Sequence, residues 1–190
     1  MALPHITNIT AGVNKYDPMF GNIFVVSFSL PDGIQNEFNK DVEILSEHVT
    51  KISGLDALDK GAAVSTQKFL GVDVSYHQPR LESTYADLSI TLNLNLRDGT
   101  DAYIYKLFRA WQRLAYDVST GERHLKKDCC ASWMRVTIAN QAGDIYRDIV
   151  FKDVMLYDTI SGLGDLDYSN GEAKTLDVKF RSDWWTEDIA

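Results

Sequence analysis

The chain has 190 residues and a formal net charge of −8 at pH 7, with 45% hydrophobic and 24% charged residues. This composition is typical of a folded domain and excludes collagen-like, low-complexity and broadly disordered chains. The acidity argues against a surface that grips nucleic acid phosphates throughout, and no apolar run approaches the roughly 18 residues that cross a bilayer, so we expect no membrane insertion.

Domain boundaries follow the local composition. Residues 1–20 are polar and mixed and predict an N-terminal arm with little core of its own. The main β-domain is expected at residues 21–186, followed by a short C-terminal tail at residues 187–190. Within the domain, residues 55–83 make an unusually long connection, of a kind that is usually functional or mobile.

The first predicted strands are rich in β-branched and aromatic residues. Residues 22–30 (NIFVVSFSL) predict a strand, and residues 32–41 predict a polar connection after it. Residues 42–52 predict a second strand. Short strands also fit residues 64–70 and 71–76, inside the long connection.

Strict alternation over residues 87–97 is the clearest pattern in the chain. Because successive side chains of a strand point to opposite sides, this segment predicts a strand with one buried and one solvent-facing side. The apolar positions are Leu88, Ile90, Leu92, Leu94 and Leu96, and the polar positions are Asp87, Ser89, Thr91, Asn93, Asn95 and Arg97.

A helix is predicted at about residues 101–116. Apolar residues recur there at steps of three or four and form one stripe that we expect to face the core. Lys106, Arg109 and Arg113 lie off this stripe, on a solvent or partner face. The core stripe comprises Ile104, Leu107, Phe108 and Trp111.

The C-terminal part predicts a β-hairpin and a final strand. Residues 131–140 and 144–157 flank a turn, residues 161–171 predict a loop rich in Gly and Asp, and residues 172–182 alternate again. In all, the pattern predicts six or seven antiparallel strands and one helix. We therefore expect a mainly β fold, an antiparallel sandwich or barrel with one flanking α-helix.

Residue types that carry chemistry are not grouped in the sequence. The four histidines lack metal-ligand spacing, and the chain has no phosphate-binding glycine loop or nucleophile motif. Cys129 and Cys130 are adjacent and have no CxxC or Cys-His context, which favours two free thiols. We therefore predict no enzyme, no catalytic residue, no metal site and no cofactor.

The order of these features resembles the tail tube protein family of contractile-tailed bacteriophages. That family shares its fold with the tube proteins of type VI secretion and related contractile injection systems. The resemblance covers about residues 20–186. It is carried by residues 22–30, 52–55 and 87–96, the helix segment 105–116 (YKLFRAWQRLAY) and the ending 176–185 (LDVKFRSDWW).

The resemblance implies a structural protein of a phage tail inner tube. Its protomers would form hexameric rings that stack into a hollow conduit for DNA ejection into the host, with strands of all subunits closing a large ring-forming β-barrel. It also implies partners, namely other copies of the chain and the tail sheath, baseplate, tape-measure and tail-terminator proteins. Genomic DNA would pass through the lumen without specific binding, which suits an acidic conduit. The location would be the virion tail, with assembly in the host cytoplasm.

Two sets of candidate residues follow from this resemblance and the alternation. The polar side of the strand at residues 87–97, with a neighbouring strand, is expected to line the lumen or else to face solvent outside the ring. The connection at residues 55–83 is expected to contact the next subunit or ring. The lumen candidates are Ser89, Thr91, Asn93, Asn95 and Asp177, and the contact candidates are Gln67, Phe69, Leu70, Val72 and Tyr76.

Two alternative functions stay open at this point. One is the inner tube of a contractile injection or secretion system that carries protein effectors. The other is a small β-barrel ligand-binding module, which requires an apolar internal cavity and a stable monomer.

Overall fold

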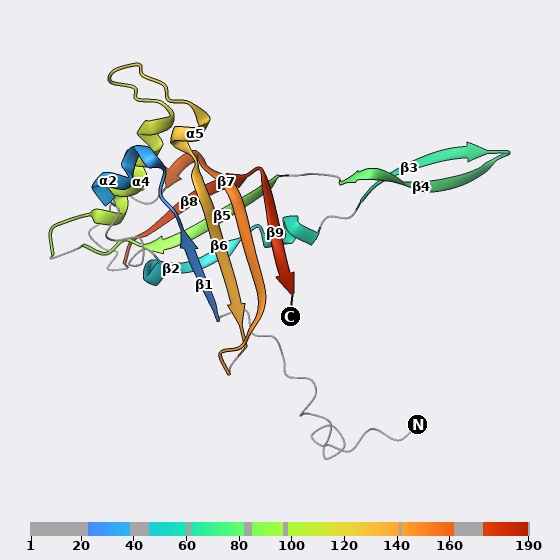
Figure 1. The fold of residues 1–190 in the computed structure, drawn as a ribbon, viewed down its shortest axis with the longest axis horizontal. Coiled ribbons are helices and arrows are strands. Elements are labelled where there is room, and N and C mark those ends of the chain that lie inside the picture. The colour runs from blue at the N-terminus through green and yellow to red at the C-terminus, as the bar shows by residue number, and fades with distance from the viewer. Residues whose placement is uncertain are drawn as a thin grey trace, which may run out of the picture.

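The structure, a computed structural model, describes residues 23–38, 46–59, 62–81, 85–96, 99–140, 142–161 and 173–189. These segments form a mainly β fold with one long helix packed on it, which confirms the predicted fold class (Figure 1). The predicted N-terminal arm and most of the predicted loop at residues 161–171 lie outside the described residues. Among the described residues, no helix has both the length and the apolar character that a membrane crossing requires.

Seven strands form one antiparallel sheet with the order β1-β6-β7-β8-β5-β2, and its seventh strand, β9, also pairs with β7. A separate two-stranded hairpin, β3–β4, projects from the body of the molecule (Figure 1). The strands are β1 Phe24–Phe28, β2 Val49–Ser53, β3 Ala62–Phe69, β4 Val72–Leu81, β5 Ala86–Asn93, β6 Ala131–Ala139, β7 Ile145–Ser161, β8 Thr175–Ser182 and β9 Trp184–Ile189. The helices are α2 Asp32–Phe38, the 3-10 helix η3 Leu55–Asp59, α4 Tyr103–Ala115 and α5 Lys126–Cys129.

The 17-residue strand β7 divides the large sheet into two halves. Its first part pairs with β6 and β9, and its last part, from Met155 onward, pairs with β8. Asp153 (φ 51°) and Asp158 (φ 68°) adopt left-handed conformations, which bend a strand where its pairing changes. We call β1-β6-β7-β9 the β9 half-sheet and β7-β8-β5-β2 the β2 half-sheet.

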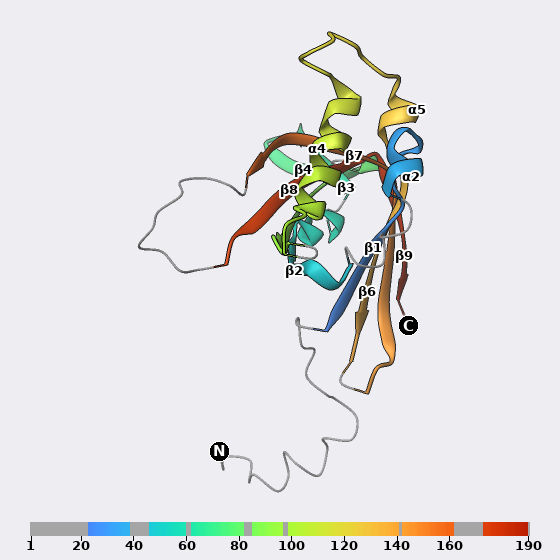
Figure 2. The same cartoon turned by 90° about the vertical axis from the view of Figure 1, so that its left-hand side faces the viewer.

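The apolar sides of both half-sheets contribute to a single core. In β5 the buried and half-exposed positions alternate as predicted, so Leu88, Ile90 and Leu92 are all buried. The strand is shorter than the predicted residues 87–97, because it ends at Asn93, and Leu96 is exposed and not buried. Helix α4 lies between the two half-sheets (Figure 2) and buries its apolar stripe there. An aromatic cluster with ring centroids 5.5 to 6.4 Å apart fills this region, formed by Phe28, Phe108, Trp111 and Phe180.

The structure corrects several local predictions. The polar connection predicted at residues 32–41 contains helix α2, which begins where the Pro31 carbonyl accepts hydrogen bonds from the backbone N–H groups of Ile34 and Gln35, each at 3.1 Å. The strand predicted at residues 42–52 begins only at Val49, because residues 46–48 are helical. The described residues also form nine strands where six or seven were predicted. The chain turns back at Asp183, and β9 pairs with β7, so residues 187–189 of the predicted C-terminal tail belong to a strand.

Candidate functional site

The polar face of the β2 half-sheet carries most of the predicted lumen residues. The register pairs Thr91 with Asp177 and places Ser89 and Asn93 on the same side of β5. Thr91 Oγ1 donates a hydrogen bond of 2.6 Å to the Asp177 carboxylate. Asn95 lies beyond the end of β5, and its amide nitrogen lies 3.0 Å from His48 Nδ1, so it does not extend this row.

The charges on this face are balanced. Arg181 donates two hydrogen bonds to Asp87, at 2.6 and 2.9 Å, and Lys179 Nζ lies 2.6 Å from Asp158. These carboxylates raise the pKa of both Arg181 and Lys179. The register places Asp87, Asp177, Lys51, Lys179 and Arg181 on this face, and Asp158 joins them through its contact with Lys179, which makes three acids and three bases.

The described charged side chains of this face therefore cancel, although the chain as a whole has a formal net charge of −8. The excess negative charge of the chain belongs to other positions. The sequence gives only the net charge of the whole chain. The strand register is needed to show that Asp87 pairs with Arg181 and Asp158 with Lys179.

Two tyrosines hold Arg181 in place, and sequence reasoning missed both of them. The guanidinium carbon lies 4.7 Å from the ring centroid of Tyr85 and 4.8 Å from that of Tyr157. Such cation–π contacts add to the bidentate bond with Asp87 and fix the side chain against the sheet. Tyr85 precedes β5 and Tyr157 lies on β7, so no local pattern in the sequence connects them.

The β2 half-sheet has two open edges. Within the described residues, β2 pairs only with β5 at one end, and the last part of β7 pairs only with β8 at the other. An antiparallel sheet with an even number of strands has edge strands that run in opposite directions. The β2 edge and the β7 edge therefore run in opposite directions, which is the orientation that an antiparallel pair between two open edges requires.

The β3–β4 hairpin is amphipathic. Its register places Gln67, Phe69, Val72 and Tyr76 on one face, which also carries Ser65 and Val74. Phe69 and Tyr76 are about half exposed, at 52% and 48%. Leu70 occupies the turn and is fully exposed. All the predicted contact residues thus lie on one hairpin face or at its tip.

The opposite face of the hairpin is mainly polar. Thr66 and Ser75 form a hydrogen bond of 3.1 Å between their hydroxyl groups, and Lys68 lies across from Asp73. Two-stranded hairpins are marginally stable in water unless one side is covered. Since β3 and β4 pair only with each other in the described part of the chain, the apolar face has no sheet partner in its own protomer.

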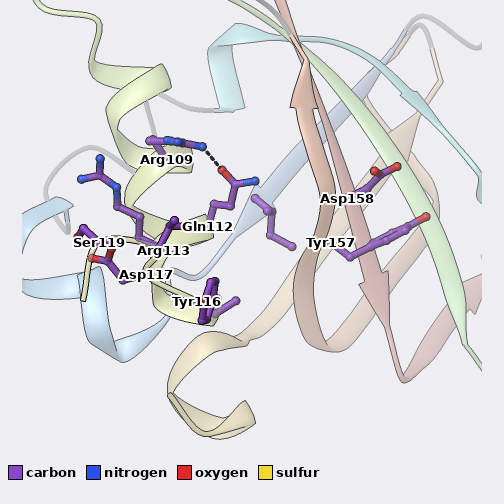
Figure 3. Close-up of a pocket in the computed structure, with 11 residues that line it drawn as sticks. Arg109, Gln112, Arg113, Tyr116, Asp117, Ser119, Tyr157 and Asp158 are labelled. Atoms are coloured by element: carbon purple, nitrogen blue, oxygen red, sulfur yellow. Dashed lines mark hydrogen bonds between the residues drawn. The ribbon is translucent and has the colours of Figure 1, made fainter. Parts of the chain in front are cut away.

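A surface cavity of about 610 Å³ lies between α4 and the last part of β7 (Figure 3). Arg109 donates a hydrogen bond to Gln112 at its rim, and the carboxylate of Asp158 is already bonded to Lys179. Ser119 donates to Asp117, a contact that lowers the pKa of Asp117, but no histidine lines the cavity to act as a base for the serine. This set does not form a nucleophile and base pair.

The described residues also do not meet the requirements of a metal site or of a reactive thiol. They contain no group of three or more His, Cys, Asp or Glu side chains placed to hold a metal ion. Cys129 and Cys130 are free and half-buried. Burial raises the pKa of both thiols, that of Cys130 to about 11, so each is a poor nucleophile near neutral pH.

No protein-family model matches the chain, and no curated protein matches it by sequence. Solved structures do match over nearly the whole chain. A chain of the sheath–tube complex of the PVC extracellular contractile injection system, in its extended state, aligns with a TM-score of 0.59 and 10% identity, covering 95% of this chain and 98% of that one.

Two structures of the anti-feeding prophage give similar results. A chain of its tube-terminating cap aligns with a TM-score of 0.57 and 12% identity, covering 92% of this chain and 93% of that one. A chain of its six-fold symmetrised baseplate aligns with a TM-score of 0.56 and 12% identity, covering 92% and 97%. At this identity the likeness establishes the fold. The chain has the fold of the tube proteins of contractile injection systems.

Proposed function

We propose that the chain is the inner-tube subunit of a contractile tail-like machine, in which hexameric rings stack into a hollow conduit. The observation that carries this proposal is the β2 half-sheet, which combines a buried apolar side, a charge-balanced polar side and two open antiparallel edges. Six copies joined edge to edge would close this half-sheet into one barrel without free edges. The fold likeness to chains of sheath–tube, cap and baseplate assemblies supports the same conclusion.

Simple geometry gives the size of this conduit. A closed barrel of about 24 strands, tilted by about 45° and spaced about 4.7 Å apart, has a backbone radius near 25 Å. Side chains on the inner face reduce the bore to about 40 Å, which still admits a DNA duplex roughly 20 Å wide. Small polar residues such as Ser89, Thr91 and Asn93 would make the wall smooth.

The pairing of charges on the wall supports transport of DNA without binding. Proteins bind DNA largely by replacing counterions with Lys and Arg side chains on the phosphates. Lys179 and Arg181 are each bonded to a carboxylate of their own protomer, so phosphates must compete for them. We therefore propose that the tube belongs to a phage tail and passes genomic DNA into the host.

A tube that carries protein effectors is the second candidate. A wall whose charges cancel offers no bias toward a cargo of either sign, and the matched structures come from contractile injection systems and a prophage particle.

The proposed partners are the same for a tube that carries DNA and for one that carries proteins. The hairpin face would contact the next subunit or ring, and the exposed Lys106, Arg109 and Arg113 of α4 would face a sheath. Baseplate, terminator and tape-measure proteins would bind at the ends and inside.

A ligand-binding β-barrel is less well supported. That function requires an apolar space between the sheets, but Phe28, Phe108, Trp111 and Phe180 pack against one another in this region. The cavity beside α4 is instead open, and its lining includes Arg109, Arg113 and Asp158.

Negative-stain electron microscopy of the purified chain over a range of concentrations tests the proposal. We expect six-membered rings or stacked tubes with an open bore as concentration rises. A monodisperse monomer at every concentration, also after addition of preformed tube ends from the same system, would contradict it. The cargo is then tested on assembled tubes, by measuring whether labelled DNA passes or is retained.

A further inference from the structure

An exposed row of aromatic residues crosses the β9 half-sheet on the side away from the core. The register places Trp133 of β6 beside Lys152 of β7, and Lys152 beside Trp184 of β9. The two tryptophans are 36% and 48% exposed. Large aromatic side chains gathered on one face of a protein commonly mark a binding surface. We call Trp133, Lys152 and Trp184 the tryptophan row.

We propose that the tryptophan row receives the apolar face of the β3–β4 hairpin from a second copy of the chain. This proposal rests on the proposed tube function, in which neighbouring copies supply the partner. The hairpin projects away from the body that carries the row (Figure 1), so within one protomer it does not cover the row. Among the described residues, neither the apolar hairpin face nor the tryptophan row is covered, so each copy offers both surfaces to another copy.

The two surfaces agree in size. Three adjacent strands separate Trp133 from Trp184 by about 10 Å, and the indole rings widen this surface further. A two-stranded hairpin is about 5 Å wide between backbones, and its apolar face from Val72 to Tyr76 extends about 13 Å along the strand. Two tryptophans, a phenylalanine and a tyrosine are 36% to 52% exposed, so covering their exposed parts would bury roughly 300 to 500 Å² per contact.

The two surfaces also agree in charge. The hairpin face presents Ser65, Gln67, Phe69, Val72, Val74 and Tyr76, which include no cation and no carboxylate. The ammonium group of Lys152 therefore meets aromatic rings that attract it and no like charge. The nearest cation on the neighbouring row, Arg135, is held by Asp148 through hydrogen bonds of 2.5 to 3.0 Å, so it does not oppose docking.

Site-specific photo-crosslinking of the full chain tests this docking. We would place the photoreactive amino acid p-benzoylphenylalanine at Tyr76, irradiate samples that electron microscopy shows to be assembled, and map the crosslinks by mass spectrometry. We expect a crosslinked dimer whose links fall on the strands that carry the tryptophan row, around residues 132–135, 150–152 and 184–186. The same probe at Lys68, on the polar hairpin face, is the matched control and is expected not to link to the row.

Each outcome decides one proposal. Links from Tyr76 to α4 or to the β2 half-sheet of the second copy, or no dimer in assembled samples, would overturn the docking while the tube function stands. Absence of rings and tubes at every concentration would overturn the tube function. The unassembled protein is then irradiated in the same way, and a row-linked dimer would still support the docking. If the Tyr76 probe prevents assembly, the probe at Gln67, on the same face, takes its place.

Substitutions in the row give a second, independent measurement. We expect Trp184→Ala to raise the concentration needed for assembly by at least about 10-fold, as for other buried aromatic contacts at interface centres. Val25→Ala, an exposed residue on the same side of the half-sheet at its far end, is the control and should leave assembly unchanged. Equal effects of the two substitutions would overturn the docking.

Discussion

At the residue scale, Gly54 combines a positive φ with a close approach of another strand. It follows β2 and adopts a φ of +96°, which L side chains rarely adopt. A Cβ added there would overlap the backbone carbonyl oxygen of Asp87 on β5. We therefore expect Gly54→Ala to lower the free energy of unfolding by more than about 3 kcal/mol, because strain in φ and a backbone clash act together. Urea unfolding followed by circular dichroism measures this.

Gly121→Ala provides the matched control for that experiment. Gly121 also has a positive φ, of +73°, but a Cβ there meets no heavy atom within 4 Å. Only the backbone strain applies, so the expected cost is about 1 kcal/mol. Equal costs at the two positions would mean that β5 moves away from the turn without penalty.

The thiols give a second prediction at this scale. Burial raises the pKa of Cys130 from 9.0 to about 11, so at pH 8 its reactive thiolate is about 100-fold scarcer than in an ordinary cysteine. We expect alkylation by iodoacetamide at pH 8 to be slower by about this factor in the folded protein, and to accelerate as the pH rises toward 11. Mass spectrometry of timed samples measures the rate. Fast alkylation of both thiols at pH 8, equal to that in urea, would contradict the buried environment.

The sequence predicts single residues well where their role depends on alternation alone. Ser89, Thr91 and Asn93 share a face because the period of a strand is two, and the apolar residues between them are buried for the same reason. The Arg181 site is different. Its partners Tyr85, Asp87 and Tyr157 come from β8's neighbours on both sides, so only the strand order and register bring them together.

At the element scale, strand β5 depends on its buried side. Leu92 is fully buried in the core, and Asp at this position places an unpaired carboxylate there. We expect Leu92→Asp to cost more than about 4 kcal/mol, a large part of the roughly 5 to 15 kcal/mol that stabilises a domain, and so to prevent folding. Asn93→Asp, the adjacent residue on the polar side, should fold normally. Circular dichroism and gel filtration compare the two variants, and a soluble, cooperatively unfolding Leu92→Asp protein would contradict the assigned face.

Helices and strands that are long enough to show a hydrophobic period are predicted from the sequence, and shorter ones are not. Helix α4 combines several turns with a regular stripe, so its existence and its buried face follow from spacing. Helix α2 spans Asp32–Phe38, about two turns, and its buried residues Ile34 and Phe38 are too few to show a helical period. The hairpin strands fit local patterns, but that their contact residues share a face requires the register set by the turn at Leu70 and Gly71.

At the scale of the whole molecule, the proposed tube requires the polar side of the β2 half-sheet to face the bore, because its apolar side packs in the core. The alternation of residues in the sequence identifies the polar and the apolar side of the strands. The same alternation would arise whether the polar side faces the solvent outside a ring or the water inside a tube. Neither the balanced charges of the polar face nor the two open edges of the half-sheet tells which way this face points in a ring. Only measurements on the assembly separate an inner wall from an outer surface.

Labelling rates in assembled tubes make this distinction. We expect a cysteine at Asn93 to react with a bulky maleimide much more slowly in long tubes than in free protomers, because the reagent reaches the bore only from the two ends. A cysteine at Arg109, on the exposed side of α4, is the control and should react at similar rates in both samples. The native thiols contribute little background, since their pKa values are raised by burial. If Asn93→Cys reacts in tubes as fast as Arg109→Cys, the polar face of the β2 half-sheet lies outside the conduit and another surface lines it.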